Sequence, residues 1–175
     1  MNAPHSHNTA TVAGLRMIEQ LRQVHEPLRA DIEVLENALQ LLSDETADLT
    51  RIPEMIDNLT IADFVWQLRV NCDFYCNTLT LHHTIEDQRM FPVMTRSFPE
   101  LAPAVERLQA EHKLVGEIVS EAKRASLALS TESSTVNRAH AAISELADHM
   151  QSHLDFEEAT LFPYFRRMDR DWHYG

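Results

Sequence analysis

The residues best suited to metal chemistry lie in a motif that the chain contains twice. Residues 82–92 and 153–163 share the pattern H-x-x-x-E-[DE]-x-x-[ML]-F-P, with His153 standing 71 positions after His82. The two copies read HHTIEDQRMFP and HLDFEEATLFP. Imidazole and carboxylate groups are ligands for transition-metal ions, so each copy offers a possible pair of metal ligands.

The spacing within each copy predicts that its histidine and glutamate act together. Four residues turn an α-helix by about 400°, so His82 and Glu86 lie on one face, a single turn apart. His153 and Glu157 have the same relationship. Two further histidines, His25 and His112, occupy the apolar stripes of other predicted helices. The chain therefore divides into two hairpins with one lone histidine and one HxxxE pair each, which suits two adjacent metal ions with the carboxylates able to bridge them.

The cost of burying carboxylates supports a metal site. Burying one carboxylate without a compensating partner destabilises the folded protein by roughly several kcal/mol, and burying two at mirrored core positions destabilises it more. The predicted stripes carry no lysine or arginine at the same depth, so a cation is expected there. Nitrogen and oxygen ligands without a thiolate favour iron or manganese over structural zinc.

Four amphipathic segments must position these groups. Apolar residues recur at steps of three and four, which is typical of helices that bury one face. The first segment spans Leu15 to Leu42 around His25, and the second begins at a Thr60–Asp63 capping box. The third runs from about Glu100 to Leu129 and the fourth from about Val136 toward Leu161. With three glycines and no sustained alternating pattern, the sequence predicts an all-α protein, an antiparallel up-and-down four-helix bundle with an N-terminal helical extension.

Prolines suggest where these helices stop. Pro27 either kinks the first helix or begins a second one after a short helix that ends near Val24. Phe91-Pro92 is expected to end the second helix, and the fourth is expected to stop before Pro163. Residues 43–59 are interpreted as a connection with a helical turn around Pro53 to Asn58. We expect one domain over residues 1–175, with a flexible N-terminus at about 1–10, the bundle at about 11–168 and a tail at 169–175.

Composition narrows the class of function. The 175 residues carry 27 Asp and Glu against 15 Lys and Arg, a formal net charge of −12. This charge argues against nucleic-acid and membrane-surface partners. No signal-peptide-like or membrane-spanning stretch is recognisable, so we expect a cytoplasmic protein. The two cysteines, Cys72 and Cys76, are expected to be free, buried thiols, because positions four apart on a helix are too distant for a disulfide.

Together these residues resemble the hemerythrin-like family, the HHE cation-binding domains, over roughly His25 to Phe165. The resemblance rests on the order H…HxxxE…H…HxxxE with its trailing Phe-Pro. It implies a four-helix bundle with a non-haem centre of two iron ions and an oxo or hydroxo bridge. It also implies that His25 and His82 bind one iron, that His112 and His153 bind the other, and that Glu86 and Glu157 bridge them.

The sequence departs from oxygen-carrying hemerythrins at two places. Those proteins have HxxxH on the third helix, whereas the residue four positions after His112 is Gly116. They have HxxxxD on the fourth, where this chain has Glu157 at four positions and Glu158 at five. The place of the missing ligand is open to water, peroxide or a side chain such as His83, His149 or Tyr75. We interpret His83 and His149 primarily as supporting or surface groups, and Tyr75 as a core residue.

Two functions follow from this resemblance. The first is a di-iron protein that binds O₂ or a related small oxidant, such as peroxide or NO, and turns it over in a catalase-like or redox reaction. The second is an iron or oxygen sensor, a metal-binding module that acts through a partner without catalysis. A structural bundle with incidental metal affinity is a third possibility. A large exposed apolar patch or a fused output domain would favour the sensor.

Overall fold

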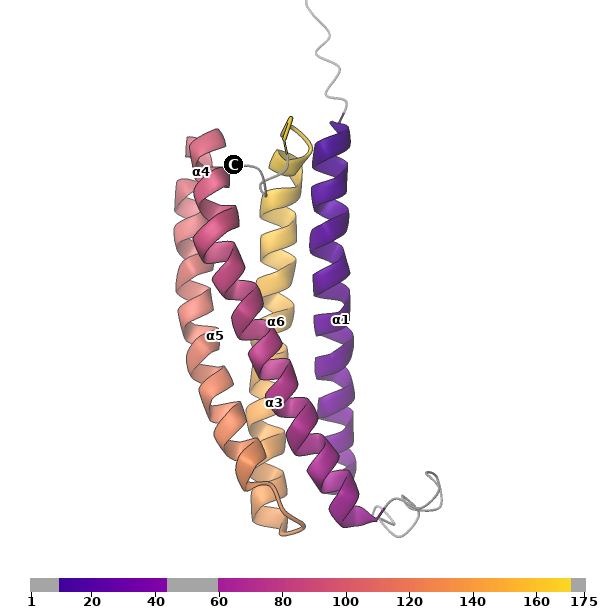
Figure 1. Cartoon of the computed structure of the whole chain (residues 1–175). Helices are drawn as coiled ribbons and strands as arrows, with labels where there is room; N and C mark the ends of the chain where they lie inside the picture. The colour runs from indigo at the N-terminus through magenta and orange to yellow at the C-terminus, as the bar shows by residue number, and fades with distance from the viewer. Residues whose placement is uncertain (1–9, 44–59, 171–175) are drawn as a thin grey trace, which may run out of the picture.

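The protein is a bundle of four long helices that run alternately up and down (Figure 1). The computed structural model describes residues 10–43 and 60–170. The long helices are α1 (Val12–Ser43), α3 (Ile61–Ile85), α5 (Ala102–Ala128) and α6 (Ser133–Phe165). A π-helical turn (Glu86–Met90), the short helix α4 (Phe91–Ser97) and a 3₁₀ turn (Pro99–Leu101) join α3 to α5. The prediction of an all-α bundle is confirmed, and the described residues include no strand.

The predicted start of the second long helix is also confirmed. Thr60 caps α3, because its side chain accepts a hydrogen bond from the Asp63 backbone while the Asp63 carboxylate accepts one from the Thr60 backbone. This reciprocal pair satisfies two of the free N–H groups at the helix start. The connection expected to contain a turn around Pro53 to Asn58 lies outside the described residues, as do residues 1–9 and 171–175.

Of the predictions based on proline, one is decided between its two alternatives and two need correction. Pro27 lies inside α1, which continues unbroken from Val12, so one helix spans this region and no separate helix ends near Val24. The helical path also continues through Phe91-Pro92, by way of the π turn and α4. The last helix runs past Pro163 to Phe165. Each proline is exposed, so the carbonyl that it leaves without a helical partner can be solvated by water.

The core consists of two apolar clusters with a polar layer between them. The first cluster fills one end of the bundle and contains Leu28, Leu79, Val115 and Leu154 at its boundary with that layer. The second cluster fills the other end and contains Leu21, Met90, Leu108 and Leu161. In every long helix the stretch between the two clusters carries the histidines or carboxylates singled out above.

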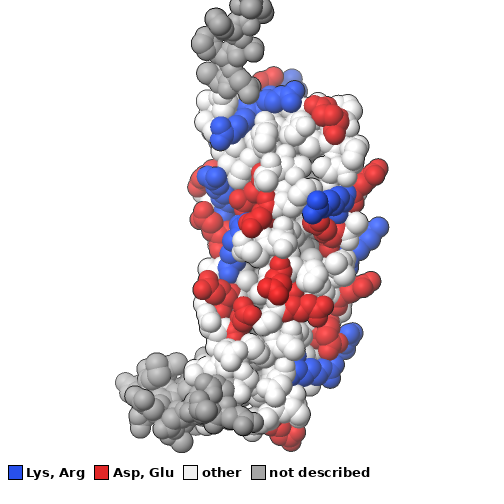
Figure 2. All heavy atoms as spheres, turned by 180° about the vertical axis from the view of Figure 1, so that it is seen from behind, with Lys and Arg blue, Asp and Glu red and all other residues white. Residues whose placement is uncertain are grey.

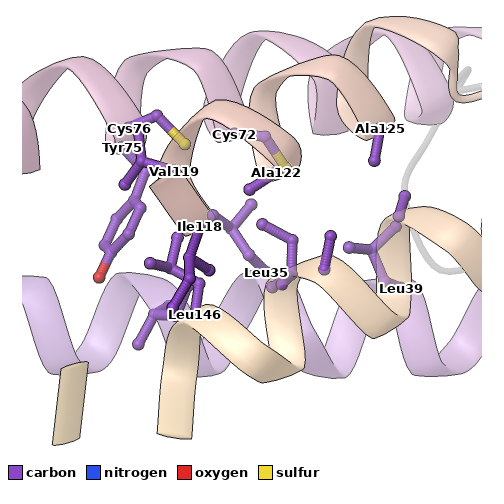
Figure 3. Close-up of a cluster of buried hydrophobic side chains, with 14 of the residues drawn as sticks. Leu35, Leu39, Cys72, Tyr75, Cys76, Ile118, Val119, Ala122, Ala125 and Leu146 are labelled. Atoms are coloured by element: carbon purple, nitrogen blue, oxygen red, sulfur yellow. The ribbon is translucent and has the colours of Figure 1, made fainter. Parts of the chain in front are cut away.

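The first apolar cluster holds both cysteines. Figure 3 shows Cys72 and Cys76 on α3 with Tyr75 among leucine, valine and alanine side chains of the other helices. Both thiols are free and buried, as predicted. Burial raises the pKa of Cys76 to about 12, so the thiol stays protonated at neutral pH.

The outer surface seen from behind is strongly charged. Figure 2 shows acidic and basic side chains interspersed over this face, as the composition led us to expect. None of the helices in residues 10–43 and 60–170 combines the length and the apolar character that a membrane span requires.

Candidate metal centre

The bundle brings all six predicted ligands into one buried layer. His25 comes from α1, His82 from α3 and His112 from α5. Glu86 is the first residue of the π turn that follows α3, while α6 supplies His153 and Glu157. Their exposed fractions are all 8% or less, and His25 and Glu157 are at 0%. The polar residues therefore occupy the interior at the level where the apolar clusters leave a gap.

The potential ligands form two groups that share one carboxylate. His25, His82, Glu86 and Glu157 make one group, and His83, Glu86, His112 and His153 make the other. Within each group the potential ligand atoms lie within 4.8 Å of one another.

Glu86 joins the two groups through its two carboxylate oxygens. Its Oε1 lies 3.2 Å from His82 Nε2 and its Oε2 lies 3.6 Å from His112 Nε2. The second carboxylate, Glu157, lies with its Oε2 3.4 Å from His25 Nε2 and 4.0 Å from His153 Nε2. The carboxylates thus lie between the histidines of the two groups, where a bridging ligand would have to lie.

Carboxylates outside this layer fix the orientation of three histidines. The Nδ1–H of His25 donates to Glu158 at 2.8 Å, that of His112 to Asp87 at 2.9 Å, and that of His153 to Glu111 at 3.0 Å. A proton held on Nδ1 leaves the lone pair of Nε2 free, and Nε2 points into the layer. This arrangement of carboxylate and histidine is typical of metal-binding imidazoles.

The same contacts distinguish Glu157 from its neighbour Glu158. Glu158 points away from the layer, where it accepts hydrogen bonds from His25 and, at 2.7 Å, from Arg29. Partial burial alone would raise the pKa of Glu158, but these hydrogen bonds outweigh it and lower the pKa. Glu157 has no such partner and belongs to the potential ligands. The geometry therefore favours Glu157 as the ligand of this pair.

The inward-pointing atoms lack the partners that buried polar groups normally have. The Nε2 atoms of His25, His82 and His83 and all four carboxylate oxygens of Glu86 and Glu157 are buried without a hydrogen bond. Burial raises the pKa of both glutamates, and the charge of Glu157 raises that of Glu86 further. Burial also lowers the pKa of His25 to about 4. Unprotonated imidazoles around unpartnered carboxylates are the donor set that a cation would satisfy.

Comparison with a family model identifies the fold. The model of the hemerythrin HHE cation-binding domain matches residues 16–165. This chain belongs to that family. Neither the curated proteins nor the solved structures compared with the chain include a significant match.

His83 is a ligand candidate of this hemerythrin domain beyond the six residues predicted from the sequence. We interpreted it as a supporting or surface group, but its side chain is buried and the residue belongs to the second group of potential ligands. Its ring stacks on that of His112, with centroids 4.0 Å apart and planes 9° apart. Gly116 and His83 line the same small pocket of about 170 Å³. Because Gly116 has no side chain, it leaves room beside the stacked rings of His83 and His112. In the sequence, this role is indicated by the adjacent pair His82-His83 together with the missing side chain at Gly116.

The two other residues considered for the missing ligand lie elsewhere. His149 is partly exposed, and its Nδ1–H donates to the Glu145 carbonyl at 2.9 Å. Tyr75 packs in the first apolar cluster. Neither belongs to a group of potential ligands among the described residues. Of the three candidates, the hemerythrin domain therefore brings only His83 into the centre.

Proposed function

We propose that this hemerythrin domain holds two iron ions and uses them to bind O₂ or a related small oxidant such as peroxide or NO, with catalase-like or redox turnover. The observation that carries the proposal is the pair of histidine groups that share Glu86. The donor atoms are nitrogen and oxygen without a thiolate, which suits iron. Two such ions, when bound and reduced, would supply one electron each to the oxidant.

The residues of the chain have separable roles in this proposal. His25 and His82 hold one ion, His83, His112 and His153 hold the other, and Glu86 and Glu157 balance the charge between them. Each group offers four protein ligands, which leaves positions for a small ligand. The apolar residues Leu79, Leu108 and Val115 are buried next to the centre and exclude water from it. Free thiols at Cys72 and Cys76 fit the reducing cytoplasm that we propose as the location.

Metal analysis and an absorption spectrum of the purified protein test the proposal. We expect two irons per chain and near-ultraviolet charge-transfer bands. The variant Glu86→Ala should lose iron and consume peroxide more slowly, whereas Glu145→Ala, on the exposed side of α6, should match the wild type. A fully folded protein that takes up no iron would overturn the metal assignment. Equal peroxide consumption by wild type and Glu86→Ala would end the catalytic part.

One observation supports the second function, an iron or oxygen sensor that acts through a partner. Large apolar side chains on α3 are exposed, among them Trp66 at 62% and Phe74 at 67%. An exposed apolar face marks an interaction site. A sensor would bind its partner through this face with an affinity that depends on the iron or oxygen state. It would also show no peroxide turnover, so the peroxide assay separates the two functions.

A further inference from the structure

The outward face of α3 carries an apolar stripe. The stripe consists of Trp66, Val70, Phe74, Leu81 and Ile85, and their exposed fractions lie between 37% and 67%. Intervals of four and seven residues place these side chains on one side of a helix. The side chains that face the core, such as Leu68, Cys72 and Leu79, lie on the opposite side. The stripe is thus a second hydrophobic face on a helix that already buries its first.

The stripe is free of charge although the chain is highly charged. Between Trp66 and Ile85 only Arg69 and Asp73 carry a charge. Both are engaged with the α5 side of the bundle, because Arg69 donates to the Leu129 carbonyl and Asp73 pairs with Lys123 of α5 at 3.1 Å. The rear surface in Figure 2, by contrast, carries many acidic and basic groups.

The exposed area is large enough to matter energetically. An aromatic side chain presents about 150–250 Å² when uncovered. Trp66 and Phe74, exposed at 62% and 67%, therefore leave about 250 Å² per chain in contact with water. Val70, Leu81 and Ile85 extend this to the few hundred Å² at which a patch marks an interaction surface.

One end of the stripe forms the rim of a pocket at the metal centre. Leu81 and Ile85 line a pocket of about 400 Å³ between α1 and α3, and His82 and Glu86 line it as well. Other walls come from α1, including Leu21 and Val24, and Met90 of the π turn also lines it. A single chain leaves the rim uncovered, since Leu81 is 60% exposed and Ile85 37%. This opening leads from solvent to two of the potential metal ligands.

The stripe is self-complementary about its middle residue. At about 1.5 Å per residue, Trp66 lies about 12 Å before Phe74, Leu81 about 10 Å after it and Ile85 about 16 Å after it. If two copies of α3 pair antiparallel with their Phe74 residues at the twofold axis, Trp66 of the second copy falls between Leu81 and Ile85 of the first. A large aromatic group then covers the rim of the pocket.

We infer that this hemerythrin domain forms a homodimer through antiparallel α3 helices, in which Trp66 of each copy closes the pocket beside the metal centre of the other. The self-complementary spacing of this uncharged stripe favours a second copy as the occupant. Two chains of net charge −12 repel one another wherever charged faces meet, so an uncharged face is where they can approach. A twofold interface also requires one surface to match itself, as this stripe does. The closure of the pocket rests on the proposed function, whereas the dimer does not.

The dimer is tested by sedimentation equilibrium with two matched lysine variants. Phe74→Lys places two like charges next to the proposed axis and should give a monomer. Leu15→Lys alters a leucine of α1 that is 50% exposed and lines no part of the pocket, and it should remain a dimer. Circular dichroism checks that both variants are as helical as the wild type. A monomeric wild type, or a dimeric Phe74→Lys variant, would overturn the proposed interface.

Fluorescence and iron release test the position of Trp66. The chain has two tryptophans, so Trp172→Phe leaves Trp66 as the only reporter. Its emission should lie at shorter wavelength in the dimer and move to longer wavelength when Phe74→Lys is added. A ferrous chelator should remove iron from Phe74→Lys several-fold faster than from Leu15→Lys. If Leu15→Lys is a dimer and Phe74→Lys is a monomer, equal release rates from the two variants would overturn the pocket closure. A chain that binds no iron would refute the proposed function and leave the dimer testable.

Discussion

Replacing Glu157 with glutamine should stabilise the metal-free protein and weaken the metal-loaded one. Glu157 is fully buried, and its carboxylate oxygens have no hydrogen-bond partner. Without a cation, burial raises the pKa of this carboxyl, so the folded protein keeps it protonated. Glutamine has nearly the same shape, and it is uncharged without having to take up a proton on folding. With metal bound, the same substitution removes one of the proposed ligands.

The size of the effect follows from the cost of taking up a proton. Protonating a carboxyl of ordinary pKa about 4.3 at pH 7 costs about 1.4 kcal/mol per pH unit, or about 3–4 kcal/mol in all. A buried amide without partners offsets part of this gain, so we expect about 2–3 kcal/mol. For a chain of this size, that corresponds to a rise in Tm of roughly 5–10 °C.

The pH dependence has a definite sign. A raised folded-state pKa means that the folded protein binds more protons than the unfolded chain at pH values above about 4.3, so this carboxyl makes stability fall as pH rises. The advantage of Glu157→Gln over wild type should therefore shrink by about 1.4 kcal/mol for each unit between pH 7 and pH 5. Urea unfolding of the two metal-free proteins at both pH values measures this difference, and the histidine contributions they share cancel.

Glu158→Gln is the matched control for this experiment. It changes the adjacent residue, whose carboxylate accepts hydrogen bonds from His25 and Arg29. Removing this charge should lower stability with and without metal, because both donors lose a charged acceptor. If Glu157→Gln instead lowered the stability of the metal-free protein, or kept the full rise in Tm on adding iron, Glu157 would not be an uncompensated carboxylate awaiting a cation.

Four further predictions concern other sites. Gly14→Ala should cost about 1–3 kcal/mol in urea unfolding, because a Cβ there would meet a backbone carbonyl in the last turn of α6. Gly116→Ala, where a Cβ would meet nothing within 4 Å, should gain about 0.5–1 kcal/mol from helix propensity. Cys76, with its raised pKa, should not react with Ellman's reagent at pH 8 until the protein unfolds, and fast labelling of the folded protein would contradict its burial. Asp87→Ala, which removes the hydrogen-bond acceptor of the α5 histidine, should weaken iron binding about 10–100-fold in a chelator competition.

Much of the fold could be predicted from the sequence because the helices are amphipathic. The positions predicted to face the core, from Leu68 to Glu86 and from Val105 to Ala122, are buried as expected. A period of 3.6 residues specifies which side of a helix faces the core. The predictions that Pro92 and Pro163 end their helices were wrong, and Pro27 lies within its helix, for one reason. Pro27, Pro92 and Pro163 each follow an exposed residue four positions earlier, so the carbonyl that loses its helical partner can be solvated.

The candidate site was predictable to the extent that it depends on position along a helix. The HxxxE spacing identified residues that converge in the bundle, but it could not choose between Glu157 and Glu158. That choice depends on where His25 and Arg29 lie across the bundle. The role of His83 likewise depends on a contact between helices, its stacking on His112 of α5. Contacts of this kind are tertiary and leave only a weak trace in one sequence.

The π turn makes the two copies of the repeated motif inequivalent. The Phe91 N–H bonds to the Glu86 carbonyl across five residues, whereas the matching stretch of α6 stays α-helical. A wider turn at Glu86 is a feature often found at functional sites. In the structure, Glu86 belongs to both groups of potential ligands and Glu157 to one.

This inequivalence makes metal stoichiometry the sharpest test of the centre. Glu86→Ala removes a carboxylate shared by both groups, so both ions should be lost together. Glu157→Ala removes a carboxylate of the group with His25 and His82, so about half of the iron should remain, held by His83, His112, His153 and Glu86. Iron analysis of the two variants, with protein concentration from amino-acid analysis, distinguishes these outcomes. Equal losses from both variants would mean that the two carboxylates are equivalent bridges and that the π turn does not differentiate them.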